Sequence, residues 1–345
     1  TKEFFASYKE LCLTLRDEID QLVKNDDVIK EDFYNKNINS FDFAKKIMNQ
    51  IIFLYFVQKK GWLGVEKNVS FAESNGDINF IQNLFNKKIV QYENFYNDVF
   101  EYLVYDELAI ARKDHISKRF NCKLPFLNIS IFEPFDNYDW KKTNIIISNK
   151  IFSKIFEVFD RFNFTVDENT SFDTEIAVDP EMLGMILENL METNEKRLSG
   201  TFFTPKNIVA DTCREVLVSF MYESLNLSQR DIFNKEVKDD YVENIFHLSN
   251  HTDPMLFGED FYEWISNNSK QIYQILNNIK ILDPAVGSGA FLVEMHNIIA
   301  QVQYFLSIHF KTGVADYYKI KKHLISNCLY GVDINPIHTE TAMMR

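Results

Sequence analysis

Cysteines and long apolar runs are scarce in this chain, and each scarcity excludes a class of protein. The four cysteines among 345 residues stand far apart, at 12, 122, 213 and 328, so we expect neither a disulfide framework nor a zinc site of paired cysteines. The longest apolar run, 51–57, has seven residues, whereas a membrane-spanning helix needs about 20. No secretion signal opens the chain. We therefore expect a cytoplasmic protein without a membrane partner.

Positive charge is also in deficit. The chain has 37 lysines and arginines against 50 aspartates and glutamates, which gives a net charge of −13. This balance disfavours a basic nucleic-acid-binding surface over the whole chain, but leaves open a local basic groove or a DNA-contacting domain outside it. The share of hydrophobic residues, 46%, is that of a soluble protein with about two domains. The chain begins with threonine, which favours a fragment of a longer protein.

Residues 1–195 are predicted to form a mostly helical domain. The stretch 41–62 has apolar residues on every side from 51 to 57, which is typical of a buried helix, and Gly61 suits its end. Residues 120–150 have no helical period, so we expect loops with a short strand or two. Asp179 and Pro180 predict the start of another helix, through a cap and a proline at the first helical position.

Residues 196–345 are expected to form a second domain. Thr204 and Pro205 predict the cap and first residue of a helix. Its inward residues are expected to be Ile208, Val209, Val216, Leu217 and Phe220. Residues 222–270 are polar and acidic, and we interpret them as an irregular insertion. His247 and His251 lie in it without the glutamate of a helical zinc motif, so we assign no metal site.

From residue 279 the pattern changes to strand, helix, strand. We expect strands at 279–283 and 328–333, a helix at 290–306 between them, and a further helix opened by Asn335 and Pro336. Such a βαβ unit binds ligands at the carboxyl ends of its strands. Asp283 and Asp333 both fall at those ends.

The turn after the first strand is a candidate ligand site. Gly287 and Gly289 permit close backbone approach, and the helix that follows offers free N–H groups. The third glycine of a dinucleotide site is missing, since Leu292 takes its place, and Asp283 would repel a pyrophosphate. A ligand with an ammonium and a carboxylate fits better, and the methionine part of S-adenosylmethionine has both. Asp333 could then accept hydrogen bonds from its ribose.

Three segments resemble the amino-group DNA methyltransferases. "LDPAVGSGAFL" and "LYGVDINP" look like their two cofactor motifs, and "SGTFFTPKNIV" looks like the motif that precedes these in adenine-specific enzymes of γ order. Upstream segments resemble the helical region of type IIG restriction–modification enzymes and phage-defence methyltransferases. The tight matches cover residues 199–205, 281–291 and 329–336. Val286 departs from the family, where many members have cysteine.

The resemblance implies a fold, a cofactor and a set of binding residues. The fold would be a helical amino-terminal domain followed by an incomplete Rossmann-like methyltransferase domain, which is an α plus α/β class. The cofactor would be S-adenosylmethionine, with Ile334 facing its adenine and Asp333 its ribose. The remaining cofactor-binding residues implied by the motifs are Thr201, Phe202, Thr204, Pro205, Asp283, Pro284, Ala285, Gly287, Ser288 and Gly289.

The catalytic loop of this family is absent from the sequence. That loop has two adjacent prolines before an aromatic residue, and none of the seven prolines here adjoins another. We therefore expect the cofactor-binding part of a restriction–modification or phage-defence adenine methyltransferase, inactive by itself. Its expected partners are double-stranded DNA, contacted mainly by regions outside this chain, and specificity or defence-system subunits.

Three alternatives remain open at this point. A methyltransferase that acts on RNA, protein or a small molecule would share the cofactor motifs. A nicotinamide oxidoreductase would need pyrophosphate on the glycine turn, which Asp283 disfavours. A non-catalytic interaction module would use the helical region to bind partner subunits.

Overall fold

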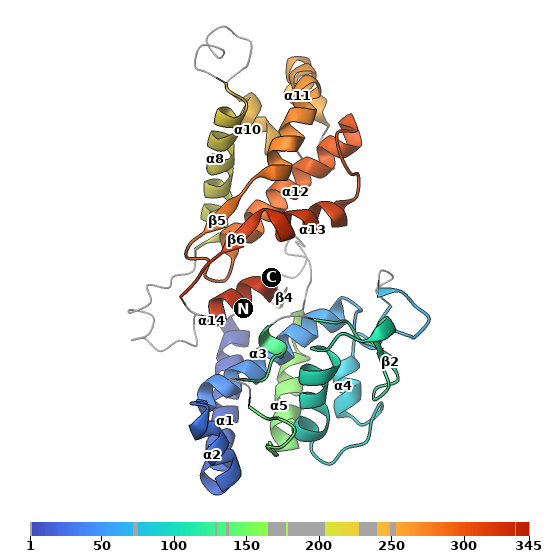
Figure 1. The fold of residues 1–345 in the computed structure, drawn as a ribbon, viewed down its shortest axis with the longest axis vertical. Helices are drawn as coiled ribbons and strands as arrows, with labels where there is room; N and C mark the ends of the chain where they lie inside the picture. Colours follow the sequence, from blue (N-terminus) through green and yellow to red (C-terminus); the bar gives the residue numbers. More distant parts are fainter. Residues whose placement is uncertain are drawn as a thin grey trace. The chain divides into compact units, whose positions relative to one another are not determined.

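The computed structural model describes residues 2–71, 75–127, 130–135, 138–164, 177–178, 204–227, 240–248, 253–334 and 336–344. The chain forms two compact units, Thr1–Leu190 and Met191–Met343 (Figure 1). Each unit has a hydrophobic core of its own. Within the described residues no helix has the length and apolar character needed to cross a bilayer.

The first unit is mostly helical over its described residues, as predicted. Its helices are α1 (Lys2–Asn25), α2 (Asp27–Asn35), α3 (Ser40–Lys59), α4 (Phe80–Phe85) and α5 (Asn149–Phe159), with π-helical turns η2 (Tyr96–Phe100) and η3 (Leu103–Glu107) and 3₁₀ turns η4 (Lys113–His115) and η5 (Ser130–Phe132). Two strand pairs complete it. β1 (Ile116–Ser117) pairs antiparallel with β2 (Cys122–Lys123), and β3 (Asn163–Phe164) pairs parallel with β4 (Ala177–Val178).

Helix α3 is the buried core helix that the sequence predicts. Nearly every residue from Phe43 to Gln58 is buried. Its buried polar side chains bind neighbouring helical elements: the amide of Gln50 donates to the Ile131 carbonyl of η5 at 2.7 Å, and Gln58 accepts from the Ile81 N–H of α4 at 3.1 Å. The helix ends at Lys59, and Gly61 after its cap residue Lys60 has a φ of +73°, a left-handed conformation that glycine adopts without strain. This end also agrees with the prediction.

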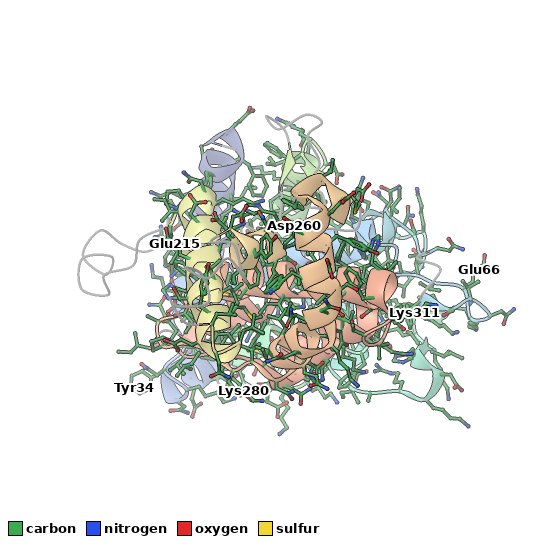
Figure 2. All side chains as sticks on the ribbon, turned by 90° about the horizontal axis from the view of Figure 1, so that it is seen from above. Tyr34, Glu66, Glu215, Asp260, Lys280 and Lys311 are labelled. Carbon is green, nitrogen blue, oxygen red and sulfur yellow. The ribbon has the colours of Figure 1, made fainter. Side chains whose placement is uncertain are left out.

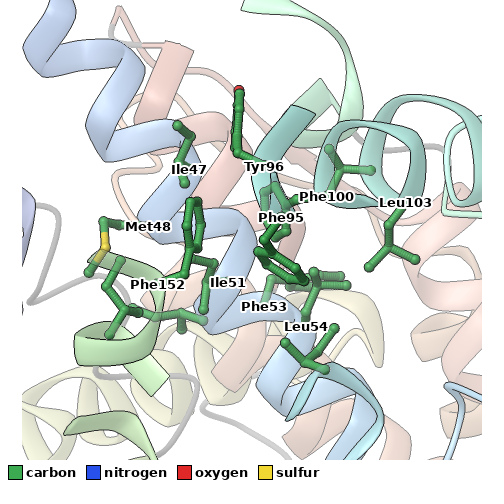
Figure 3. Packing of buried hydrophobic residues seen from close by; sticks show 14 of the residues in the cluster. Ile47, Met48, Ile51, Phe53, Leu54, Phe95, Tyr96, Phe100, Leu103 and Phe152 are labelled. Carbon is green, nitrogen blue, oxygen red and sulfur yellow. The ribbon is translucent and has the colours of Figure 1, made fainter. Parts of the chain in front are cut away.

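Aromatic rings fill much of the space around α3 (Figure 3). The Phe95 ring lies 5.2 Å from that of Phe152 at a steep angle, and Tyr96 stacks on Phe152 at 6.1 Å. Such ring pairs contribute about 0.5–1.5 kcal/mol each beyond the area that they bury. In this unit the abundant phenylalanine therefore builds a hydrophobic core.

The second unit contains the predicted strand–helix–strand order. Its elements are α8 (Lys206–Ser224), α10 (Tyr241–Ile245), η7 (Pro254–Phe257), α11 (Glu259–Asn278), β5 (Ile281–Asp283), α12 (Ala290–Phe310), α13 (Tyr317–Asn327), β6 (Leu329–Gly331) and α14 (Pro336–Met344). β5 and β6 are parallel neighbours, with Asp283 opposite Gly331. The helix expected after Asn335 is confirmed as α14. Helices α8, α11 and α12 lie side by side in Figure 1 and share one core.

The start and inward face of α8 differ from the prediction. The helix begins at Lys206, one residue late, because Pro205 has an extended ψ of 141° and occupies the cap position without a side-chain bond. Of the expected inward residues Val209 and Leu217 are buried and Phe220 is partly buried, but Ile208 and Val216 are 50% and 52% exposed. The buried stripe instead recurs every four residues, at Val209, Cys213, Leu217 and Met221. Glu215 lies on the outward side (Figure 2).

The description of 222–270 as irregular was wrong where it overlaps the end of α8, the short helix α10 and, over its last part, α11. Residues from Glu259 onward form α11, a long amphipathic helix that buries Phe261, Ile265 and Leu276 in the second core. The acidic composition of the segment hid this apolar stripe. The helix expected after Asp179 and Pro180 lies outside the described residues.

Candidate functional site

The tips of β5 and β6 are joined by backbone hydrogen bonds. The N–H of Val332 donates to the Asp283 carbonyl at 2.9 Å, and the N–H of Val286 donates to the Val332 carbonyl at 2.9 Å. The Gly289 N–H then donates to the Val286 carbonyl at 2.8 Å, which closes the turn before α12. The turn after one strand and the segment after the next therefore form one continuous edge, as the parallel strands predict.

The two glycines of the turn are required for different reasons. Both have positive φ, +52° at Gly287 and +83° at Gly289. A Cβ added to Gly287 would meet no protein atom within 4 Å, so the chain leaves space there. A Cβ added to Gly289 would lie 2.9 Å from the Cβ of Ala342 in α14, closer than real side chains approach. Gly289 thus permits helix packing, while Gly287 opens the turn toward space that a ligand could occupy.

Two carboxylates stand at the strand tips. Asp283 Oδ1 accepts the Ala285 N–H at 3.0 Å, which bends the chain into the turn. Asp333 Oδ2 accepts the Gly287 N–H at 2.9 Å, although the two residues are 46 positions apart. The structure therefore brings the predicted residues of both motifs together.

The Asp333 carboxylate has a second partner. Its Oδ1 lies 3.1 Å from Nδ1 of His338 in the first turn of α14, and the two side chains are only 10% and 8% exposed. Sequence reasoning missed His338. The signal available was a histidine one turn into the helix that follows the second motif, although this position acquires meaning only when α14 returns to the glycine turn.

The remaining motif residues differ in exposure. Ile334 is 93% exposed, so its apolar side chain is available to a flat ligand. Pro284 and Ala285 are exposed, and Ser288 is partly buried. These three line the turn beside Gly287.

The motif before α8 is placed only in part. Thr204 is partly buried and Pro205 is exposed, with no side-chain cap on the helix; Thr201 and Phe202 lie outside the described residues. α8 itself lies against the turn region, because the Cys213 thiol donates to the Phe291 carbonyl in the first turn of α12 at 3.7 Å. Burial, and after it the charge of Glu294, raises the pKa of Cys213 to about 12, so this thiol stays protonated.

Groups of three or more potential metal-ligating side chains are absent from the part of the chain that the structure describes. The carboxylates of the strand tips are instead arranged with backbone N–H donors around an open turn. Such an arrangement suits an organic ligand with a cationic group and hydroxyl groups.

No protein-family model matches the chain. It is 26% identical over 371 aligned residues to a Methanocaldococcus jannaschii protein provisionally assigned as a type II restriction enzyme and methyltransferase, across 100% of this chain and 29% of that protein. Its fold is similar to that of the type IIL restriction–modification enzyme MmeI, solved in complex with DNA, with a TM-score of 0.54, 11% identity, and coverage of 98% of this chain and 35% of MmeI. The chain thus spans about a third of each relative.

Proposed function

We propose that the second unit binds S-adenosylmethionine and that the chain is the cofactor-binding part of a DNA adenine methyltransferase from a restriction–modification or phage-defence system. One observation carries this proposal: Asp283 and Asp333 stand at neighbouring parallel strand tips, and the turn between them is open at Gly287. Similarity to restriction–modification proteins along nearly the whole chain supports it.

The proposed domain order places a helical region at about 1–195 before a partial Rossmann-like methyltransferase domain at 196–345. The parallel β5–β6 pair with α12 packed beside it is compatible with one portion of such a sheet. Further strands would come from the rest of the protein.

Each side of the site suits a different part of the cofactor. We assign the methionine ammonium to Asp283, because a carboxylate at this tip favours a cation. Asp333 would accept hydrogen bonds from the ribose hydroxyls, since a carboxylate offers about four acceptor positions and can serve protein donors and a ligand together. The exposed Ile334 would lie against the adenine.

The other proposed cofactor residues surround the methionine. Pro284, Ala285, Gly287, Ser288 and Gly289 form the turn beneath it, and Thr201, Phe202, Thr204 and Pro205 would flank it. When bound, the cofactor supplies an electrophilic methyl group. The residues of this chain would bind and orient that cofactor. The catalytic loop would belong to regions outside the chain, and those regions would bind the flipped adenine.

Calorimetric titration with S-adenosylmethionine and with NAD tests the proposal. We expect the chain to bind S-adenosylmethionine and not NAD. Asp283→Asn should weaken that binding by about tenfold or more, because it removes the charge but keeps the oxygen that accepts from Ala285. Asp260→Asn, at the exposed start of α11, is the matched control and should bind normally. Binding of NAD alone would refute the proposal.

A further inference from the structure

A single carboxylate connects three elements of the second unit. Asp333, just beyond β6, accepts from Gly287 in the turn between β5 and α12, and contacts His338 of α14. The contact with His338 is at 3.1 Å and is almost fully shielded from water. The rotamer of Asp333 is therefore fixed on both sides, by Gly287 46 positions earlier and by His338 five positions later.

His338 is itself held firmly. Its side chain is 8% exposed, and Ala342, one turn further along α14, lies directly against Gly289. Helix α14 thus contacts the glycine turn through Ala342 and the neighbouring carboxylate through His338. A ring fixed in this way can keep the Asp333 carboxylate in one orientation before any ligand arrives.

We propose that His338 is a positioning residue for cofactor binding, which presents the Asp333 carboxylate to the ribose hydroxyls. This inference rests on the proposed function. His338 need not touch the cofactor. It acts through Asp333, because a carboxylate already ordered loses less conformational freedom when the ligand binds.

The order of Asp333 determines which part of a ligand the site selects. An ordered Asp333 favours ligands that have both ribose hydroxyls, and it has little influence on the methionine end, which is assigned to Asp283. Loss of His338 should therefore reduce the preference for ribose over deoxyribose. A purely structural role would weaken all ligands to the same degree, because it would disturb the whole site.

The test is calorimetric titration of the chain with S-adenosylhomocysteine and with its 2′-deoxyribose analogue. We expect His338→Ala to weaken binding of the ribose ligand by about tenfold, on the order of one immobilised side chain, and binding of the deoxyribose ligand much less. His338→Asn should restore most of the preference for the ribose ligand over the deoxyribose ligand, because the amide nitrogen of asparagine can take the place of Nδ1.

Controls separate the possible failures. His323→Ala makes the same chemical change in α13, where the ring contacts the Asn277 carbonyl at 2.9 Å and not Asp333, and should leave the ligand preference unchanged. Unaltered binding by His338→Ala, or equal weakening of both ligands, would overturn the inference while the proposed function stands. Failure of the unmodified chain to bind either ligand would overturn the proposed function, and this inference with it.

Discussion

The backbone N–H of Gly287 donates to Asp333 Oδ2 at 2.9 Å, so the turn that follows β5 is fastened to the segment that follows β6. This bond joins the two sequence motifs into one site. Removing the Asp333 carboxylate should reduce both the stability of the unit and its affinity for the ligand. Substitutions in the turn itself can change one of these two properties without the other.

Asp333→Ala should lower the free energy of unfolding by about 1–3 kcal/mol, because it leaves the partly buried Gly287 N–H and the buried His338 ring without their acceptor. Thermal or chemical unfolding measures this loss. We also expect binding of S-adenosylhomocysteine to fall below detection. A variant with unchanged stability would contradict the geometry of this site.

Alanine at the two glycines of the turn should give different results. Both changes force a non-glycine residue into positive φ, at about 1–2 kcal/mol. Gly289→Ala should cost about 1–3 kcal/mol more, because the new methyl group would collide with Ala342. Gly287→Ala meets no protein atom, yet its methyl group enters the proposed ligand space.

Unfolding and ligand titration of both variants together check this difference. Gly287→Ala should keep most of its stability and lose cofactor affinity. Equal stability losses at the two positions, or full affinity in Gly287→Ala, would show that the two glycines do not have the separate roles inferred here.

The stability of the first unit should decrease as pH rises, owing to Glu101. This side chain is 0% exposed and accepts from the Tyr138 hydroxyl. Burial raises its pKa well above the usual value of 4.5, and the hydrogen bonds from Tyr138 and Tyr96 only partly oppose this. The folded state therefore holds the proton more tightly than the unfolded state, so its contribution is complete below pH 4.5 and is lost as pH rises toward the folded pKa.

Glu101→Gln removes that titration. Chemical unfolding at pH 5 and pH 8 should show a smaller decrease in stability for this variant than for the unmodified chain. Glu157→Gln, whose side chain is 68% exposed in a pair with Arg161, is the control and should follow the unmodified chain. Parallel pH profiles for all three proteins would rule out a buried neutral acid at Glu101.

His296 should make the second unit sensitive to acid. Burial, and then the charge of Lys321, lower the pKa of this histidine from 6.5 to about 4. Its contribution to stability is therefore present above pH 6.5 and lost as pH falls through 4, at about 1.4 kcal/mol for each pKa unit, or about 3 kcal/mol in all. His296→Gln should reduce this loss in acid unfolding followed by circular dichroism. If His296→Gln unfolded at the same pH as the unmodified chain, that result would contradict the lowered pKa of His296.

Local patterns in the sequence predicted those features that local physics determines. The end of α3 just before Gly61 and the start of α14 at Pro336 each depend on the conformation of a few adjacent residues. The inward face of α8 could not be predicted this way, because it is set by packing against α12 and not by the most apolar residues. Ile208 and Val216 are exposed for that reason.

The residues of the site also differ in whether the sequence alone could predict their positions. The proximity of Asp283 and Asp333 followed from the topology, since parallel strands place their carboxyl ends at one edge. The contact of His338 with Asp333 joins residues only five positions apart, but the return of α14 to the turn through Ala342 and Gly289 is a tertiary contact that no spacing in the sequence reveals. Helix α11 was missed because polar residues, mostly asparagine, serine and glutamine, separate its apolar positions.

A crystal structure of the chain with S-adenosylhomocysteine is the most direct test of the proposed site. We expect the methionine ammonium within hydrogen-bonding distance of Asp283, the ribose hydroxyls on Asp333, and the adenine against Ile334. A ligand bound elsewhere, or bound in the reverse orientation with its adenosine at Asp283, would contradict it.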